Sequence, residues 1–185
     1  MILPFSTQIN GKPTCFIQRI WACLLQIDYD LYDDYLHPDG FPPQMPWPPS
    51  SYKNFTPKRH SIREDKNNRW KVGTKIDFFI NARQKNMFRF APVLPVVSTQ
   101  KVEFIWKDNT ENLSCLGITY DRTCTIMIDD KFYADAYLLN DWVVSSSYNL
   151  KDFANNDGFD TIEDFFAYFN ENYTGKLIHW TNLKY

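Results

Sequence analysis

Lys58 and Ser61 lie three residues apart in a polar stretch, and together they could attack an amide bond. A serine hydroxyl becomes a nucleophile when a neighbouring base removes its proton, and lysine serves as that base if burial lowers its pKa towards neutrality. A carboxylic acid must then protonate the leaving amine, and Asp157, just before Gly158, is our candidate. If this hypothesis holds, Lys58→Ala should abolish turnover and leave the melting temperature nearly unchanged.

A second interpretation gives the same residues no chemistry. Lys58 would then be a solvated loop lysine, Ser61 a turn or helix-cap residue, and Asp157 a turn former ahead of Gly158. The spacing alone fits this interpretation at least as well. The two differ in one observable: whether Lys58, Ser61 and Asp157 converge within hydrogen-bonding reach in a pocket or scatter over the surface.

Basic and aromatic residues follow Ser61 and could hold a nucleotide. Arg63 could bind a phosphate or carboxylate through bidentate hydrogen bonds, or it could pair structurally with neighbouring acidic side chains. Arg69 and Lys71 flank Trp70, so this turn could stack a base and neutralise its phosphate. Packing of Trp70 into the core is the alternative. His60 and His179 are interpreted as a loop imidazole and an edge-strand residue without a catalytic role.

The stretch PKRHSIREDKNNRWKVGTKI, residues 57–76, resembles the ASCH family of PUA-like β-barrels. Its K-x-x-S-I-R tract and the following strand entry match the family's recognisable core, and ANNDGF at residues 154–159 looks like the segment before the family's last helix and strand. The resemblance covers residues 58–180 and is closest to small bacterial members that hydrolyse acetylcytidine. It implies an α+β fold, a PUA/ASCH-like mixed β-barrel with flanking helices.

The resemblance also implies a cleft lined by Lys58, Ser61 and Asp157. We expect neither a cofactor nor a metal. Serine stands where those enzymes have threonine, and aspartate stands where they have glutamate. We therefore expect an RNA- or nucleotide-binding domain that uses a cleft near the tract from Lys58 to Arg63. The alternative is an amidohydrolase that deacylates a modified cytidine or similar nucleoside. A third possibility is a protein partner that docks on the proline-rich segment.

The elements expected to position these residues are two amphipathic helices and a series of short strands. One helix spans Thr14–Leu24 with Thr14 as N-cap, and the other spans Asp160–Asn170 behind a capping box of Asp160 and Glu163. Polar pairs at 108–109 and 121–122 are interpreted as turns. The predicted strands are Lys75–Ile80, Met87–Phe90, Val93–Val97, Lys101–Trp106, Leu116–Tyr120, Thr123–Asp129, Phe132–Tyr137 and Lys176–Trp180.

Residues 38–57 hold seven of the 11 prolines, so this segment cannot form a central strand or a long helix. We interpret it as an irregular, comparatively mobile surface insertion within a single domain of residues 1–185. The insertion is either a lid over a pocket or a packed loop.

Composition restricts the function further. The formal net charge of −2 argues against a protein that mainly grips duplex phosphates, so any nucleic-acid role must be local. The four cysteines form no C-x-x-C pair and the three histidines are scattered, which predicts reduced thiols and no zinc site. No apolar run is long enough to span a membrane, and no secretory signal precedes the first helix. We expect a cytoplasmic protein.

Overall fold

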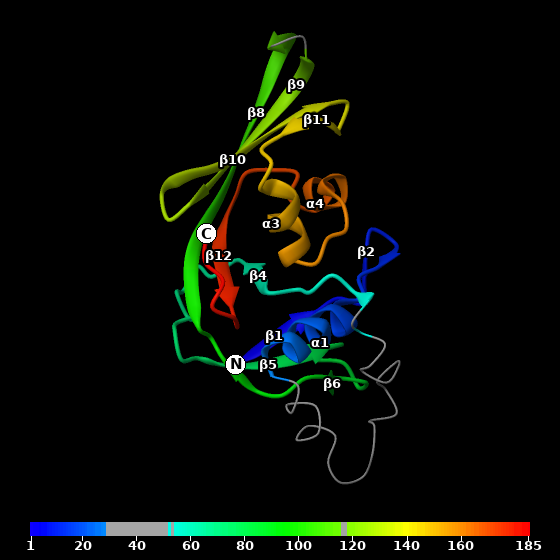
Figure 1. Cartoon of the computed structure of the whole chain (residues 1–185), viewed down its shortest axis with the longest axis vertical. Helices are drawn as coiled ribbons and strands as arrows, with labels where there is room; N and C mark the ends of the chain where they lie inside the picture. The colour runs from blue at the N-terminus through cyan, green and yellow to red at the C-terminus, as the bar shows by residue number, and fades with distance from the viewer. Residues whose placement is uncertain (29–51, 53, 116–117) are drawn as a thin grey trace.

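The computed structural model describes residues 1–28, 52, 54–115 and 118–185. These residues form an α+β fold in which a strongly curled, six-strand antiparallel half-barrel is combined with three helices and a smaller sheet (Figure 1). The sequence analysis predicted a β-barrel with flanking helices. The described part of the chain shows a half-barrel, so the β-rich α+β class is confirmed.

The half-barrel has the strand order β11-β10-β9-β8-β12-β4, and every neighbouring pair is antiparallel. The strand β4 lies at one edge and is paired only to β12 among the described strands, with Ile62 opposite Leu177. The six strands are β4 (His60–Arg63), β8 (Ser98–Cys115), β9 (Ile118–Ile128), β10 (Lys131–Leu139), β11 (Trp142–Ser146) and β12 (Tyr173–His179).

The smaller sheet lies below the half-barrel in Figure 1 and is built around β5. The first strand of the chain pairs with β5 in parallel, and two short strands pair with β5 antiparallel. A separate two-stranded hairpin follows the first strand. These strands are β1 (Ile2–Phe5), β2 (Gln8–Ile9), β3 (Lys12–Pro13), β5 (Lys75–Ile80), β6 (Phe88–Arg89) and β7 (Leu94–Pro95).

Helix α1 (Phe16–Ile27) confirms the predicted first helix and buries its apolar stripe beside β1 and β5. Thr14 is not its N-cap. Cys15 takes that position in the left-handed conformation, while the Thr14 hydroxyl donates to the carbonyl of Ser6 at 2.7 Å. The side chain of Trp21 is fully buried, and its indole N–H donates to the carbonyl of Phe90 at 2.7 Å.

Helix α4 (Ile162–Tyr168) confirms the second predicted helix, but its cap lies one residue later than expected. Thr161 caps it by accepting the Asp164 N–H at 3.1 Å, so Asp160 is free to pair with Arg19 at 2.6 Å. The sequence analysis missed helix α3 (Leu150–Asn156), which precedes α4 and packs against the half-barrel through Phe153. Both helices lie on the same side of the curled sheet (Figure 1).

The expected turns at 108–109 and 121–122 are wrong, because these residues lie inside the long strands β8 and β9. Asp108 stands directly opposite Arg122, and the Arg122 Nε donates to its carboxylate at 2.9 Å. The guanidinium of Arg122 also lies 4.4 Å from the centre of the Trp106 ring. A cross-strand pair of opposite charges stabilises the sheet at a place where the residue types alone favour a turn.

Most of the proline-rich insertion, residues 38–51 and 53, lies outside the described residues, so its predicted irregularity and its role as a partner site are not tested. Tyr52, near its end, is fully buried. Among the described helices, none is long and apolar enough to cross a membrane. The three cysteines with described side chains, Cys15, Cys23 and Cys124, are free thiols.

Candidate functional site

Two helices hold the backbone of Lys58, which lies just before β4. The Lys58 N–H donates to the carbonyl of Arg19 in α1 at 3.0 Å, and the Arg59 N–H donates to the carbonyl of Asn156 at the end of α3 at 2.8 Å. The segment that enters β4 is therefore fixed between the two hydrophobic clusters of the protein. This position carries the Lys58 side chain towards the residue that follows α3.

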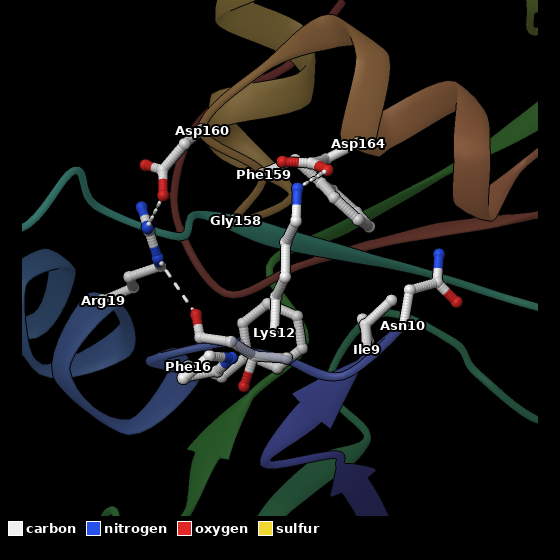
Figure 2. A pocket seen from close by; sticks show the side chains of 11 residues that line it. Ile9, Asn10, Lys12, Phe16, Arg19, Gly158, Phe159, Asp160 and Asp164 are labelled. Carbon is white, nitrogen blue, oxygen red and sulfur yellow. Dashed lines mark hydrogen bonds and ion pairs between the residues drawn. The ribbon is translucent and has the colours of Figure 1, made fainter. Parts of the chain in front are cut away.

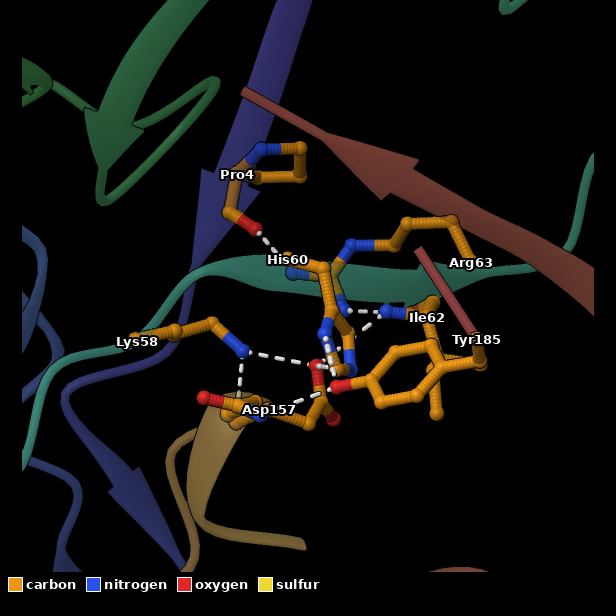
Figure 3. Close-up of polar contacts among 8 residues, drawn as sticks. Pro4, Lys58, His60, Ile62, Arg63, Asp157 and Tyr185 are labelled. Atoms are coloured by element: carbon orange, nitrogen blue, oxygen red, sulfur yellow. Dashed lines mark hydrogen bonds and ion pairs between the residues drawn. The ribbon is translucent and has the colours of Figure 1, made fainter. Parts of the chain in front are cut away.

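That residue is Asp157, which is 99 positions from Lys58 in the sequence (Figure 3). The Lys58 ammonium donates to Asp157 Oδ1 at 2.8 Å and also to the main-chain carbonyl of Asp157. The same carboxylate oxygen accepts the Ile62 N–H of β4 at 3.2 Å. The predicted convergence of Lys58 and Asp157 is thus present, and the interpretation of Lys58 as a solvated loop residue is wrong.

Both members of this pair are buried, Lys58 with 1% and Asp157 with 5% of the surface exposed. The Lys58 ammonium lies 4.8 Å from the ring centre of Phe16 and 6.0 Å from that of Phe5. Burial lowers the pKa of Lys58 to about 8, although the neighbouring Asp157 carboxylate opposes this shift. Burial also raises the pKa of Asp157, opposed by Lys58. The lysine can therefore lose its proton far more readily than one in water.

Ser61 is buried in β4, but it does not complete the expected set. Its hydroxyl has no hydrogen-bond partner among the described residues, so it makes no bond with Lys58. Side chains alternate along a strand, so Ser61 and Ile62 face opposite sides of β4. The structure brings together the base and the acid of the hypothesis and leaves the nucleophile buried nearby without contact.

Phe16 and Gly158, which both lie close to the Lys58 side chain, also line a small pocket of about 90 Å³ (Figure 2). Gly158 lies so close to the lysine that a Cβ atom added there would be 3.1 Å from Lys58 Cδ and 2.7 Å from Phe16 Cε1. The pocket is lined by Ile9, Asn10, Lys12, Pro13, Thr14, Phe16, Arg19, Gly158, Phe159, Asp160 and Asp164.

Arg63, at the end of β4, lines a larger and more open cleft of about 580 Å³. Its guanidinium donates to the carbonyls of Pro4 at 2.8 Å and Ile62 at 3.2 Å, and it lies 5.4 Å from the ring centre of Phe5. Its Nε–H has no hydrogen-bond partner among the described residues. The rest of the cleft is formed by the end of β1, the turn after it and the turn after β5, at Pro4, Phe5, Ser6, Thr7, Gln8, Asn81, Ala82 and Gln84.

The acidic neighbours of Arg63 are paired elsewhere. Glu64 pairs with Lys66 at 2.8 Å and Asp65 pairs with Lys176 at 2.9 Å, so the expected alternative of a structural pair between these residues and Arg63 does not occur. The arginine is held by main-chain carbonyls instead. A carbonyl positions a guanidinium without neutralising its charge. The nearby carboxylate that does interact with this charge is Asp157, whose raised pKa is partly opposed by Arg63.

The turn from Arg69 to Lys71 makes contacts that stabilise the fold. Trp70 is buried in the cluster with β1 and β5, which confirms the core-packing alternative for its ring. The N–H groups of Arg69 and Trp70 donate to the Asp65 carboxylate at 2.8 and 2.9 Å. The side chains of Arg69 and Lys71 are exposed and line neither of the two pockets described above.

His60, which the sequence analysis placed in a loop, lies fully buried in β4 beside the pair. His179 is also fully buried, in a strand between β8 and β4, so its placement at an edge is wrong as well. The His60 Nδ1 lies 3.1 Å from the Tyr185 hydroxyl, and its Nε2 lies 3.9 Å from Asp157 Oδ1 (Figure 3). Side chains alternate along a strand, so His60 lies on the same face of β4 as Ile62. This alternation could have predicted from the sequence that His60 is buried.

Within the described part of the chain, no group of three or more His, Cys, Asp and Glu side chains is arranged to hold a metal ion. Comparison of the sequence with family models and with curated proteins, and of the fold with solved structures, finds no match. The resemblance to the ASCH family therefore stays a prediction from the sequence.

Proposed function

We propose that this protein is a PUA/ASCH-like domain that binds a nucleotide or a nucleotide of an RNA in the cleft beside Arg63. The observation that carries the proposal is the Arg63 guanidinium, which lines a cleft of about 580 Å³ and is held there by the main-chain carbonyls of Pro4 and Ile62. Clefts that bind small ligands have volumes of about 300–1,000 Å³. A phosphate that meets a guanidinium gains charge-assisted hydrogen bonds.

The remaining walls of the cleft suit the sugar and base of a nucleotide. Ser6, Thr7, Gln8, Asn81 and Gln84 offer hydroxyl and amide groups that donate and accept hydrogen bonds without adding charge. One cation in a polar cleft also agrees with a chain whose formal net charge is −2. Such a site favours one phosphate over a long duplex backbone.

The arrangement around β4 supports the finer PUA/ASCH-like assignment. The residues of the K-x-x-S-I-R tract form the entry and the body of an edge strand in a curled sheet. The second stretch of the resemblance meets this tract through Asp157, which bonds both Lys58 and the N–H of Ile62. Two stretches that resemble one family are thus in contact.

Calorimetric titration with cytidine 5′-monophosphate tests the proposal. The wild-type protein should bind, and Arg63→Gln should weaken binding about tenfold or more, because it removes a charge-assisted hydrogen bond. Arg69→Gln is the matched control, since Arg69 is exposed and outside the cleft. Equal affinity of the wild type and Arg63→Gln would refute the proposed site.

The alternative function, hydrolysis of an acylated cytidine, is favoured by the Lys58–Asp157 pair. With its pKa lowered to about 8, neutral Lys58 could take a proton from the Ser61 hydroxyl or from a water molecule. The attacking oxygen would bond to the acyl carbon, the bond from this carbon to the cytidine nitrogen would break, and Asp157 in its protonated form would give a proton to the leaving amine. If Ser61 attacks, water would then hydrolyse the acyl-serine ester. Burial favours that protonated form.

Hydrolysis of N4-acetylcytidine above the uncatalysed rate would establish this alternative. Lys58→Met should abolish it, whereas Ser61→Ala should abolish it only if serine is the nucleophile and should lose much less if water attacks. Binding of cytidine monophosphate without any hydrolysis would leave the binding domain as the function and exclude the amidohydrolase.

A further inference from the structure

A buried chain of polar groups continues from Asp157 away from Lys58. It consists of the Asn156 amide, the Tyr185 hydroxyl, the His60 ring and the Asp157 carboxylate (Figure 3). The Asn156 Nδ2 donates to the Tyr185 hydroxyl at 3.0 Å, and this hydroxyl lies 3.1 Å from His60 Nδ1. The functions proposed above make no use of His60 or Tyr185.

The hydrogen bonds around Tyr185 favour one tautomer of His60. The Asn156 amide NH₂ group donates to the Tyr185 oxygen, and the single Tyr185 hydrogen has His60 Nδ1 within hydrogen-bonding distance as its acceptor. His60 Nδ1 is then an acceptor without a proton. A neutral imidazole with a bare Nδ1 carries its proton on Nε2.

The surroundings of the ring favour this neutral form. Full burial, together with the neighbouring His179 and Lys58, holds the pKa of His60 well below its usual range. Aromatic rings enclose the imidazole, with Phe153 at 5.5 Å and Tyr185 at 5.4 Å between ring centres. The Asp157 carboxylate lies beside Nε2, so a proton on Nε2 has a carboxylate as its neighbour.

The distance from His60 Nε2 to Asp157 Oδ1, 3.9 Å, is longer than a hydrogen bond, and Nε2 has no other partner among the described residues. At present the same oxygen accepts from Lys58 and from Ile62. We propose that His60 is a positioning residue whose Nε2–H bonds Asp157 when the Lys58 amine turns towards a ligand, with Tyr185 favouring the required tautomer. This role rests on the use of the Lys58–Asp157 pair in the alternative function above.

Nitrogen NMR of the His60 ring in the ligand-free protein tests the proposal without any activity. We expect a neutral ring with its proton on Nε2 throughout pH 6–8, and Tyr185→Phe should shift both ring nitrogens as the single tautomer is lost. A proton on Nδ1 in the wild type, or ring nitrogens that do not respond to Tyr185→Phe, would overturn it. This NMR experiment uses no ligand. A negative NMR result therefore does not contradict the proposed nucleotide binding, and a failure to bind nucleotides does not change what the NMR shows about His60.

A second variant tests whether Nε2–H faces Asp157. Lys58→Met removes one donor from the Asp157 oxygen, so the Nε2 proton should move downfield as it forms a hydrogen bond. Lys12→Met, which removes an exposed lysine paired with Asp164, is the control and should leave the resonance in place. An Nε2 proton resonance that does not move in folded Lys58→Met would contradict the proposal. If that variant does not fold, the tautomer of His60 in the wild-type protein is the deciding measurement.

Discussion

At the scale of single residues, the central feature is the buried ion pair between Lys58 and Asp157. Removing one member of such a pair leaves an unpaired buried charge, which costs about 3–5 kcal/mol. This corrects the expectation that replacing Lys58 would leave stability unchanged. That expectation assumed a lysine exposed in a cleft, whereas the ammonium is covered by Phe5 and Phe16.

We therefore predict that Lys58→Met lowers the free energy of unfolding by about 3–5 kcal/mol, measured by urea denaturation. The double variant Lys58→Met/Asp157→Leu should recover most of the loss, because no buried charge is left unpaired. Lys12→Met, which breaks an exposed pair with Asp164, should cost less than about 1 kcal/mol. A Lys58→Met protein as stable as the wild type would show that the pair is solvated.

The same burial predicts a pH dependence. The pKa of Lys58 is about 8 in the folded protein, whereas its ordinary value is 10.5, so between these values the unfolded chain holds a proton that the folded protein has released. The free energy of unfolding contributed by Lys58 should therefore rise from about pH 8 to pH 10.5. The measurement is the difference between wild type and Lys58→Met across this range, since other groups also titrate there. A difference that falls or stays flat would contradict the lowered pKa.

At the scale of elements, the connection between α3 and α4 decides where Asp157 points. Gly158 follows Asp157 with a φ of +95°, a conformation that residues with a Cβ rarely adopt. Its backbone also lies against Phe16 and the Lys58 stem. The turn thus requires glycine for two separate reasons, one conformational and one steric.

Gly158→Ala should lower the free energy of unfolding more than Gly73→Ala does. Both glycines have positive φ, so both variants carry a backbone cost of about 1–2 kcal/mol. A Cβ at Gly73 meets no atom within 4 Å, whereas one at Gly158 would collide with Phe16. The difference between the two variants in urea denaturation measures the close packing, and equal losses would mean that Phe16 moves aside freely.

The sequence predicted the elements whose own pattern determines them. The stripe from Phe16 to Leu24 indicated α1, and Lys75–Ile80 matched β5 to the residue. The strands predicted in the region of β8 and β9 were too short. The turn propensity of Asp108 is overridden by its partner Arg122 across the sheet. Within the site, Lys58 and Asp157 came from a resemblance, whereas the role of His60 depends on Tyr185, a contact across 125 positions that local spacing does not contain.

At the scale of the whole molecule, β4 joins two hydrophobic clusters. Ile62 belongs to the cluster that includes α3 and α4, while Phe5 and Phe16, which cover Lys58, belong to the cluster around α1 and β5. The candidate site therefore lies where these clusters meet. Its Arg63 cleft opens between β1 and the turn after β5.

One arginine in this cleft predicts weak salt dependence of RNA binding. If a single phosphate of a single strand is neutralised, the affinity should fall only about threefold between 50 and 200 mM salt, because the slope of log K against log salt is about −0.7 per phosphate. Fluorescence anisotropy with a short labelled RNA provides this slope. A loss of a hundredfold or more would indicate a broad basic surface that the described residues do not present at this cleft.

The most direct test of the binding site is an amide NMR titration of the wild-type protein with cytidine 5′-monophosphate. The proposed site predicts saturable shifts that are largest around the cleft, at Ser6, Thr7, Gln8, Arg63, Asn81, Ala82 and Gln84. Arg63→Gln should remove them at the same nucleotide concentration. Shifts that centre on residues 69–71 instead, or no shifts at any amide at millimolar nucleotide, would contradict the assignment of the Arg63 cleft as the nucleotide site.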